Sequence, residues 1–398
     1  MHSDQSDMSI DRNLINEYRI LHIISGLDVG GAETMLLKLI EKQSKKCASI
    51  TVVCLRTTGV LVGAYESAGA DVRCLGLEVK SPLSVWRIFR LMPLIWDIRP
   101  DVIQGWMYHG NLAATIANFF FLSKSQLYWN IRQTIDGLQS ERLLTRGLIK
   151  GGRFFSSFPE AIIYNSYRSA LQHEQLGYKK DLRKIIPNGF EMEKFQPLAD
   201  CLKRDVKASL GLPNDARIIG HVARYHSKKD HKTFLFAMEK VLEKSSNTRV
   251  IVVGRNVTLE NEEIKDQVAG FLCLDQMNFL GERRDIPALM GIFDLFVSSS
   301  SAGEGFPNTI GEAMASGVPC VATDVGESST IVGNCGWIVR PGNFEELAHV
   351  VIDLLGKPSA YLKGRGQRGR ERVALKYNIR DIERQYFLLY SSQMLELL

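Results

Sequence analysis

Residues 294–323 decide the fold, and they read DLFVSSSSAGEGFPNTIGEAMASGVPCVAT. The first five residues are apolar enough for a short strand buried in a parallel sheet, and so are residues 320–323 at the far end. Between them a loop containing glycine leads into a helix. A strand, a loop, a helix and a second strand in this order predict a βαβ unit.

Two carboxylates stand in this unit with seven residues between them: Glu304 on the loop and Glu312 about one turn into the helix. The amides of Asn308 and Thr309 lie at the predicted helix N-terminus, where free N–H groups and the helix dipole favour a phosphate. Either glutamate alone is better explained as an ordinary loop residue or a solvated helix residue. Taken together, a phosphate seat between two carboxylates that can accept hydrogen bonds from hydroxyl groups suits a sugar nucleotide.

This block continues with Ala313-Met314-Ala315-Ser316-Gly317-Val318-Pro319 and with 323–326. It resembles the signature of retaining glycosyltransferases of family 4, and the resemblance runs from about Arg19 to the C-terminus. It implies an α/β fold of GT-B architecture, in which two Rossmann-like doubly wound domains face a central cleft. Within this family, residues 305–312 look most like those of members that build bacterial surface polysaccharides, such as O-antigen or capsule.

Alternating strand and helix patterns on both sides of a Pro187-Asn188-Gly189 turn predict two domains. We expect a disordered N-terminal segment over 1–17, an acceptor-binding domain over 18–187 and a nucleotide-sugar-binding domain over 188–376. The resemblance implies that the helix of residues 377–398 crosses back to the first domain. The expected strands are 19–25, 49–55, 71–75, 101–104, 161–164, 217–223, 249–253, 277–280, 294–298 and 318–322.

Composition narrows the class of protein. With 398 residues, 45% hydrophobic and 23% charged, the chain is long enough for two globular domains. The longest apolar run, 115–122, is too short to span a bilayer, and residues 1–17 have no signal-peptide core. Seven scattered cysteines without a CxxC pair suggest reduced thiols. We therefore expect a cytoplasmic protein.

Two cations follow the expected strand 217–223: Arg224 and Lys229. Fixed cations at the carboxyl end of a strand can neutralise a diphosphate leaving group as charge develops on it. The resemblance gives both residues this role. Lys228 is adjacent, so the register of the clamp is open by one residue, with Lys229 preferred.

The resemblance also implies donor contacts outside these two loops. It places His109 against the donor sugar, although a lone histidine is more often structural. It places Gly30 and Gly31 beside the donor phosphates, where a tight turn without a ligand explains the pattern equally well. Arg283, with Arg284, stands where the family binds the nucleobase. The remaining expected donor contacts are the loop residues Gly305, Phe306, Pro307, Asn308 and Thr309.

Two features that are common in glycosyltransferases are absent from this sequence. No D-x-D triplet occurs in the chain, so we expect no metal and no cofactor. Many family members carry a glutamate four residues after Gly326, and this chain has Thr330 there. A donor contact at that position is therefore in doubt.

The predicted activity is transfer of a sugar from a nucleotide-diphosphate donor, UDP-sugar first, to the hydroxyl of a glycan or lipid-linked glycan. No residue resembles a dedicated nucleophile, and the resemblance implies that the donor phosphate helps to deprotonate the acceptor. We expect Glu304 to bind sugar hydroxyls and Glu312 the ribose. The alternatives are a GT-B-fold nucleotide-sugar epimerase and a catalytically silent subunit of a polysaccharide assembly complex. No nucleic acid partner is expected.

Residues 83–184 are basic, with 14 Lys and Arg against 7 Asp and Glu. Large apolar residues accompany the charges in 86–92 and 148–155. Such helices can lie on an anionic membrane surface. The competing interpretation places the apolar residues in the core and leaves the cations as a solvated face. Peripheral binding to the inner face of the cytoplasmic membrane is thus a prediction for the first domain.

Overall fold

The structure is a computed structural model, which describes residues 18–77, 82–120, 125–135 and 143–392. The disorder expected for residues 1–17 concerns a segment outside the described residues. Contacts divide the chain into two compact units. The first contains the chain up to Pro187, except for a short stretch after Arg132, together with the chain from Arg380 onward. The second contains Asn188–Ile379.

The first unit is built on a parallel sheet of seven strands in the order β3-β2-β1-β4-β5-β6-β7. Two of these strands, β5 and β7, are not predicted from the sequence. β5 alternates polar and apolar residues, yet all six are buried. The strands are β1 Arg19–Ile24, β2 Ser49–Cys54, β3 Asp71–Cys74, β4 Val102–Trp106, β5 Gln126–Ile131, β6 Ala161–Tyr164 and β7 Arg183–Ile185.

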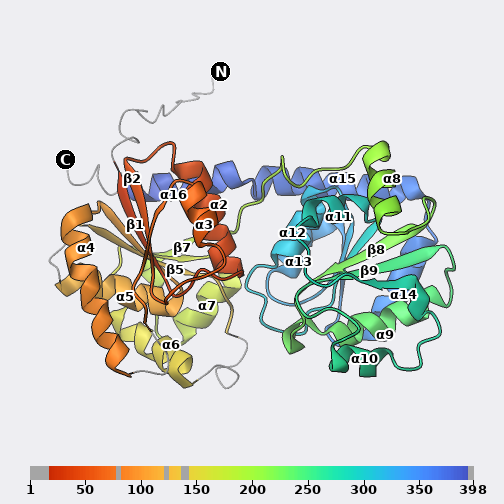
Figure 1. The fold of residues 1–398 in the computed structure, drawn as a ribbon, viewed down its shortest axis with the longest axis horizontal. Coiled ribbons are helices and arrows are strands. Elements are labelled where there is room, and N and C mark those ends of the chain that lie inside the picture. Colours follow the sequence, from red (N-terminus) through yellow and green to blue (C-terminus); the bar gives the residue numbers. More distant parts are fainter. Residues whose placement is uncertain (1–17, 78–81, 121–124, 136–142, 393–398) are drawn as a thin grey trace, which may run out of the picture. The chain divides into compact units, whose positions relative to one another are not determined.

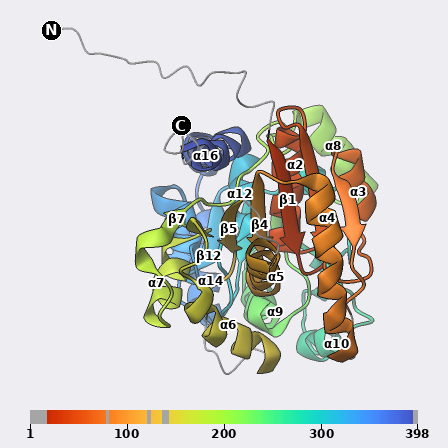
Figure 2. The same cartoon turned by 90° about the vertical axis from the view of Figure 1, so that its left-hand side faces the viewer.

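Helices cover both faces of this sheet, with α2 and α3 on the face opposite α4 and α5 (Figure 1). Helix α5 contacts α4 on one side and α6 on the other (Figure 2). The helices of this unit are α2 Gly31–Gln43, α3 Val62–Ser67, η1 Pro82–Arg90, α4 Leu91–Ile98, α5 Met107–Phe120, α6 Leu143–Phe155, α7 Tyr167–Gln175, η3 Lys180–Leu182 and α16 Ile379–Ser392.

Helix α16, the last in the chain, packs on the first unit through polar contacts. Asn130 Nδ2 donates to Tyr386 Oη at 2.8 Å, and Tyr390 Oη donates to Gln104 Oε1 at 2.6 Å. The sequence predicts a second domain that ends at residue 376, and the second unit continues to Ile379. The reason is Tyr377, whose ring packs against Phe306 of that unit at 5.5 Å.

The second unit has a parallel sheet of six strands in the order β10-β9-β8-β11-β12-β13. The edge strand β13 was not expected from the sequence. The strands are β8 Arg217–Val222, β9 Thr248–Val253, β10 Met277–Phe279, β11 Leu295–Ser298, β12 Cys320–Thr323 and β13 Trp337–Val339.

The α-helices of the second unit are α8 Asp200–Ser209, α9 His231–Leu242, α10 Glu262–Val268, α11 Ile286–Ile292, α12 Asn308–Ala315, α13 Ser328–Val332, α14 Phe344–Leu355 and α15 Ser359–Lys376. Its short 3₁₀ helices are η4 Ser227–Lys229, η5 Leu274–Gln276 and η6 Gly333–Cys335. Among the described residues of both units, no helix has the length and apolar character needed to cross a membrane.

Candidate active site

The order of strands in the second unit defines where a ligand can bind. Strands are added in one direction from β8 to β10 and in the other from β11 to β13, so the direction reverses between β8 and β11. Open α/β sheets bind ligands at the carboxyl edge of such a switch point. Arg224 and Lys229 follow β8, and Glu304 follows β11. The strand order therefore brings these predicted residues to one edge of the sheet.

The centre of this edge is an ion pair between Lys229 Nζ and Glu304 Oε1. The carboxylate is only 8% exposed, and Ser300 Oγ donates to the same oxygen at 2.7 Å. A buried carboxylate is costly unless it is paired and hydrogen-bonded, and here it is both. The sequence predicts separate roles for the two residues, whereas in the structure they form an ion pair.

The adjacent lysine, Lys228, holds the loop through its backbone. Ser301 N donates to Lys228 O at 2.9 Å, and Ser299 Oγ donates to Lys229 O at 3.0 Å. These bonds fasten the loop after β11 to the loop after β8. Between the two candidates, Lys229 is therefore the one whose ammonium group contacts Glu304.

A third loop, after β12, touches Glu304 through a glycine. Gly326 has φ +60°, and a Cβ atom there would stand 1.6 Å from Glu304 O. Only glycine fits such a close approach at positive φ. Glu304 is thus held by loops that follow three adjacent strands of the sheet.

Helix α12 begins beside Glu304 with features that favour an anion. Its N-cap residue, Pro307, provides no side-chain cap, and its first turn contains no acidic residue. Asn308 is fixed by Asn188, whose Nδ2 donates to Asn308 Oδ1 at 2.7 Å. The amides of the first turn and the helix dipole therefore face a site without a competing carboxylate of their own.

The loop between Glu304 and α12 is anchored by its aromatic residue. Phe306 is buried and stacks on Phe190 with ring centroids 6.1 Å apart, and Gly305 beside it is buried as well. Thr309 and Glu312, on the first and second turns of α12, are partly exposed. Within the predicted donor residues 304–312, the loop is thus buried and anchored, and Thr309 and Glu312 remain accessible.

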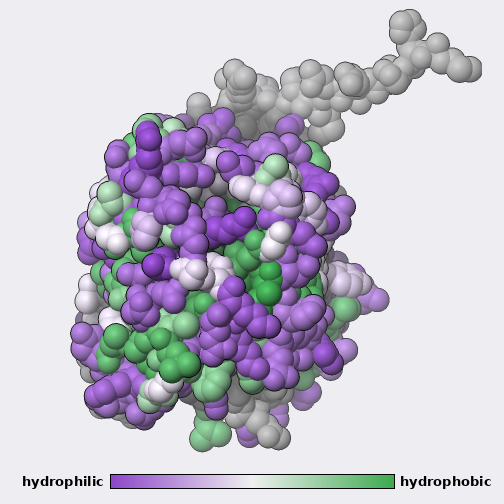
Figure 3. Space-filling model, turned by 90° about the vertical axis from the view of Figure 1, so that its right-hand side faces the viewer, coloured by the Kyte–Doolittle hydropathy of each residue, from purple (hydrophilic) through white to green (hydrophobic). Residues whose placement is uncertain are grey.

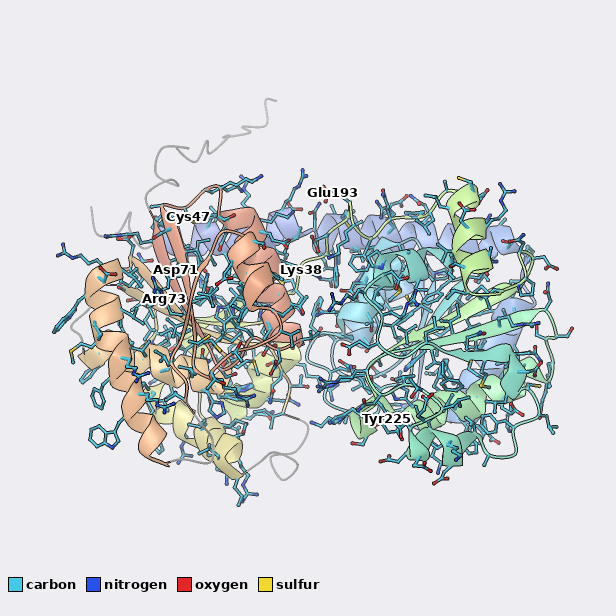
Figure 4. The ribbon with its side chains drawn as sticks, in the orientation of Figure 1. Lys38, Cys47, Asp71, Arg73, Glu193 and Tyr225 are labelled. Carbon is cyan, nitrogen blue, oxygen red and sulfur yellow. The ribbon has the colours of Figure 1, made fainter. Side chains whose placement is uncertain are left out.

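Two predicted cations differ in position. Arg224 is exposed on the loop after β8, next to Tyr225, which is labelled in Figure 4. The Tyr225 hydroxyl donates to Glu263 Oε2 at 2.9 Å. Arg283 follows β10, which β9 separates from β8. It forms two hydrogen bonds to Asp285, from Nε at 2.9 Å and from Nη2 at 2.6 Å. Arg224 therefore shares the loop of Lys229, and Arg283 lies two strands away.

His109 occupies the equivalent edge of the first unit. There the direction of strand addition reverses between β1 and β4, and His109 lies on the first turn of α5, directly after β4. A Cβ atom at Gly110 would stand 2.3 Å from Ile23 O, so glycine lets this turn approach β1 closely. Burial, and then the charge of Arg56, lowers the pKa of His109 below its usual value. At neutral pH the imidazole is therefore uncharged.

Gly30 and Gly31 stand at the turn from β1 into α2, as the sequence predicts. Gly30 is the N-cap residue of α2, and a Cβ atom there would stand 2.3 Å from Glu33 Oε2. A carboxylate at this helix N-terminus repels a diphosphate. The N-terminus of α12 is therefore better suited to a phosphate than the turn formed by Gly30 and Gly31.

Two charged residues near these sites, Glu327 and Arg56, are not predicted from the sequence. Glu327 directly follows Gly326 and is buried. Thr330, which stands where many family members carry a glutamate, is exposed. Arg56 follows β2 and acts on the pKa of His109. Glu327 could have been found from its place directly after Gly326, and Arg56 from its place after the strand predicted at 49–55. Among the described residues, no group of three or more His, Cys, Asp or Glu side chains is arranged to hold a metal ion.

Comparison with known proteins finds glycosyltransferases. Residues 216–357 match the family described as Glycosyl transferases group 1. EpsF of Bacillus subtilis (strain 168), a glycosyltransferase by name, is 25% identical over 317 residues, which are 78% of this chain and 80% of EpsF. LpsB of Rhizobium meliloti (strain 1021), a lipopolysaccharide core biosynthesis mannosyltransferase, is 34% identical over 177 residues, 44% of this chain and 48% of LpsB.

A solved structure shares the fold. HepE of Anabaena, crystallised in complex with UDP, has a TM-score of 0.82 and 21% identity, and the match covers 94% of this chain and 100% of HepE. Residues 216–357 of the second unit thus match the group 1 glycosyltransferases, the curated relatives are glycosyltransferases by name, and nearly the whole chain shares the two-domain GT-B fold of HepE.

Proposed function

We propose that this glycosyltransferase is a retaining enzyme of family 4 that takes its sugar from a nucleotide-diphosphate donor, UDP-sugar first, and acts in the assembly of a surface glycan. The donor class is supported by HepE, which was solved with UDP. The pathway is supported by LpsB, whose name places it in lipopolysaccharide core biosynthesis.

The observation that carries the proposal is the Lys229–Glu304 ion pair beside the uncapped start of α12. A diphosphate seated on the first turn of α12 would draw the Lys229 ammonium toward its own charge. Glu304 would then be available to accept hydrogen bonds from sugar hydroxyls. Fixed positive charge next to the leaving phosphate stabilises the transition state more than the ground state.

The other predicted residues complete this arrangement. Arg224 supplies a second cation on the same loop, and Glu312 on α12 binds the ribose hydroxyls. Neutral His109 acts as a hydrogen-bonding partner of the donor sugar. The donor phosphate assists deprotonation of the acceptor hydroxyl, so the reaction proceeds without a protein nucleophile. Because Lys229, Arg224 and the α12 amides neutralise the leaving group, no metal ion is required.

A screen of donor hydrolysis tests the proposal. Purified protein is incubated with UDP-, GDP- and ADP-sugars, and free nucleotide is measured. We expect release from UDP-sugars, lost in Glu304→Gln and retained in the matched control Glu345→Gln, a 71% exposed glutamate of the same unit. Epimerised free sugar would indicate the epimerase. Absence of turnover with every donor and acceptor tried would favour the silent subunit.

The acceptor surface is the second part of the proposal. In the first unit, η1, α4 and α6 expose large apolar side chains that include Trp86 (69% exposed), Trp96 (62%) and Phe154 (67%). Phe119, Phe155 and Phe158 add exposed rings in mutual contact, at centroid distances of 5.9 and 6.2 Å. By contrast, hydrophilic residues predominate on the face of the second unit shown in Figure 3.

Cations accompany these rings. Arg90, Lys150 and Arg153 are exposed on η1 and α6, and Arg153 lies over the Phe154 ring at 4.5 Å. Exposed aromatic residues among cations suit the interface of an anionic bilayer, where each cation contributes roughly 1 kcal/mol. We infer that the first unit binds the inner face of the cytoplasmic membrane peripherally, where a lipid-linked acceptor would be found.

Flotation with liposomes tests this surface. We expect the protein to float with vesicles that contain phosphatidylglycerol and to remain behind with neutral vesicles. Charge reversal at Arg90, Lys150 and Arg153 should abolish flotation. Reversal of three exposed cations of the second unit, Arg204, Lys244 and Lys265, is the matched control. Equal loss in both variants, or no binding at low salt, would contradict a membrane-binding first unit.

A further inference from the structure

A cavity of about 70 Å³ lies between α5 and α6 in the first unit. Its walls include Leu112 of α5, Trp129 of β5, and Leu148 and Phe155 of α6. Gly147 and Gly151, also on α6, complete the wall on that side. The lining is thus mostly hydrocarbon, contributed by a helix that also exposes apolar side chains to solvent.

The glycines of α6 keep this pocket open. A Cβ atom at Gly147 or at Gly151 would meet no atom within 4 Å, so packing does not require glycine at either position. Gly152 differs, since a Cβ atom there would stand 2.2 Å from Tyr178 Oη. Glycine inside a helix costs about 1 kcal/mol relative to alanine. Packing does not explain these two glycines on the pocket wall, which indicates that the space beside them receives a ligand.

The polar groups around the pocket are largely satisfied by the protein. Trp129 Nε1 donates to Thr115 Oγ1 at 2.9 Å, and Tyr178 Oη donates to Ile149 O at 2.9 Å. Asn111 is buried, and its Oδ1 accepts from Asn130 N at 3.1 Å, which leaves its Nδ2 without a partner among the described residues. A sugar would need several hydrogen bonds here, whereas an apolar chain needs none.

The position of the pocket indicates which apolar chain enters it. Tyr108, Asn111 and Leu112 of its wall stand on the same turns of α5 as His109. Phe155 of its wall is also exposed and contacts the ring of Phe158. The pocket therefore lies between the edge of the sheet that carries His109 and the surface we assign to the membrane.

We propose that the pocket between α5 and α6 holds part of the hydrocarbon chain of a lipid-linked acceptor. The proposal rests on the proposed function, because it names the acceptor class of that reaction. A bulk membrane lipid is the competing occupant. It is less favoured because the pocket borders the turn of His109 as well as the exposed rings.

Binding of farnesyl phosphate, measured by calorimetry without any donor, tests the pocket. Isopentenyl phosphate has the same head group on a short chain, so it reports the phosphate alone. The variant Gly151→Leu fills the pocket from a position where a side chain has room. The matched control is Gly364→Leu, an exposed glycine of α15 with equally open surroundings.

We expect farnesyl phosphate to bind the wild-type chain and Gly364→Leu equally, and Gly151→Leu at least tenfold more weakly. Isopentenyl phosphate should bind none of them measurably. The Tm of Gly151→Leu should not fall, since leucine is the better helix former. Equal affinity for the two phosphates, or equal affinity of Gly151→Leu and wild type, would overturn the proposal.

Two further readouts separate this inference from the proposed function. Because the binding assay needs no donor, lack of donor hydrolysis would refute the transferase proposal without touching the pocket. Hydrolysis without farnesyl phosphate binding would refute the pocket alone. Vesicle flotation of Gly151→Leu should match wild type, and its loss would show that a membrane lipid, rather than the acceptor, occupies the pocket.

Discussion

Replacing Gly326 with alanine should displace Glu304 through a steric clash and so lower activity. The new Cβ would stand 1.6 Å from Glu304 O, whereas side-chain carbons essentially never approach closer than 3.0 Å. The neighbour is backbone, so it cannot rotate away as a flexible side chain would. The loop that carries Glu304 must move by more than 1 Å, and its pairing with Lys229 moves with it.

The size of the effect follows from this displacement. Misplacing a catalytic group by about 1 Å can cost roughly 100-fold in rate, which corresponds to about 2.7 kcal/mol of transition-state stabilisation. Alanine at positive φ costs a further 1–2 kcal/mol of stability, roughly. We therefore expect kcat to fall about 100-fold or more, while Tm falls by only several degrees.

The matched control is Gly342→Ala. Gly342 also has positive φ, +72° against +60° for Gly326, but a Cβ atom there meets nothing within 4 Å. It therefore carries the backbone penalty without the clash. Steady-state donor hydrolysis and thermal denaturation are measured for both variants. If the two retain similar kcat while both remain folded, the close packing of Gly326 on Glu304 does not position the carboxylate.

Three other predictions concern the same chain. Glu304→Gln should lower kcat by at least 100-fold, whereas Glu312→Gln should mainly raise the donor KM, because a ribose contact acts equally in ground and transition states; near-wild-type kinetics in both would contradict the assigned roles. Donor hydrolysis should persist in EDTA, and a loss restored by Mg²⁺ or Mn²⁺ would show that a metal is needed. Burial lowers the pKa of His173 to about 4, while the unfolded chain takes up this proton near pH 6.5. Stability should therefore fall as the pH drops from 6.5 to 4, by about 3 kcal/mol from this group, and His173→Gln should show a shallower dependence of Tm on pH.

Most strands could be predicted because they are short, buried apolar runs flanked by loops. The strand β5 could not, because its polar residues are buried against distant partners. Tyr128 Oη donates to Leu389 O, and Asn130 Nδ2 donates to Tyr386 Oη, both on the last helix. A pattern of polar residues becomes a buried strand only when such partners are supplied by the tertiary structure.

The candidate site also combines features that local sequence predicts with a contact that only the structure shows. The sequence of residues 304–312 sufficed to predict a loop, a helix start and two carboxylates, since these depend on neighbours a few positions apart. Lys229 and Arg224 could be placed after a strand for the same reason. The contact between Lys229 and Glu304 could not be predicted from local sequence, because 75 residues separate the two along the chain.

By itself, the sequence determined the alternation of strands and helices, the turn near Pro187 and the residue types at each loop, because local periodicity and backbone preference encode these features. Only the tertiary structure decided that β8 lies beside β11, that Lys229 pairs with Glu304, and that Gly326 presses on the same loop. The physical reason is that strand order in a parallel sheet is set by non-local packing. Contacts across that order follow from how the whole sheet assembles, and no short window of residues contains them.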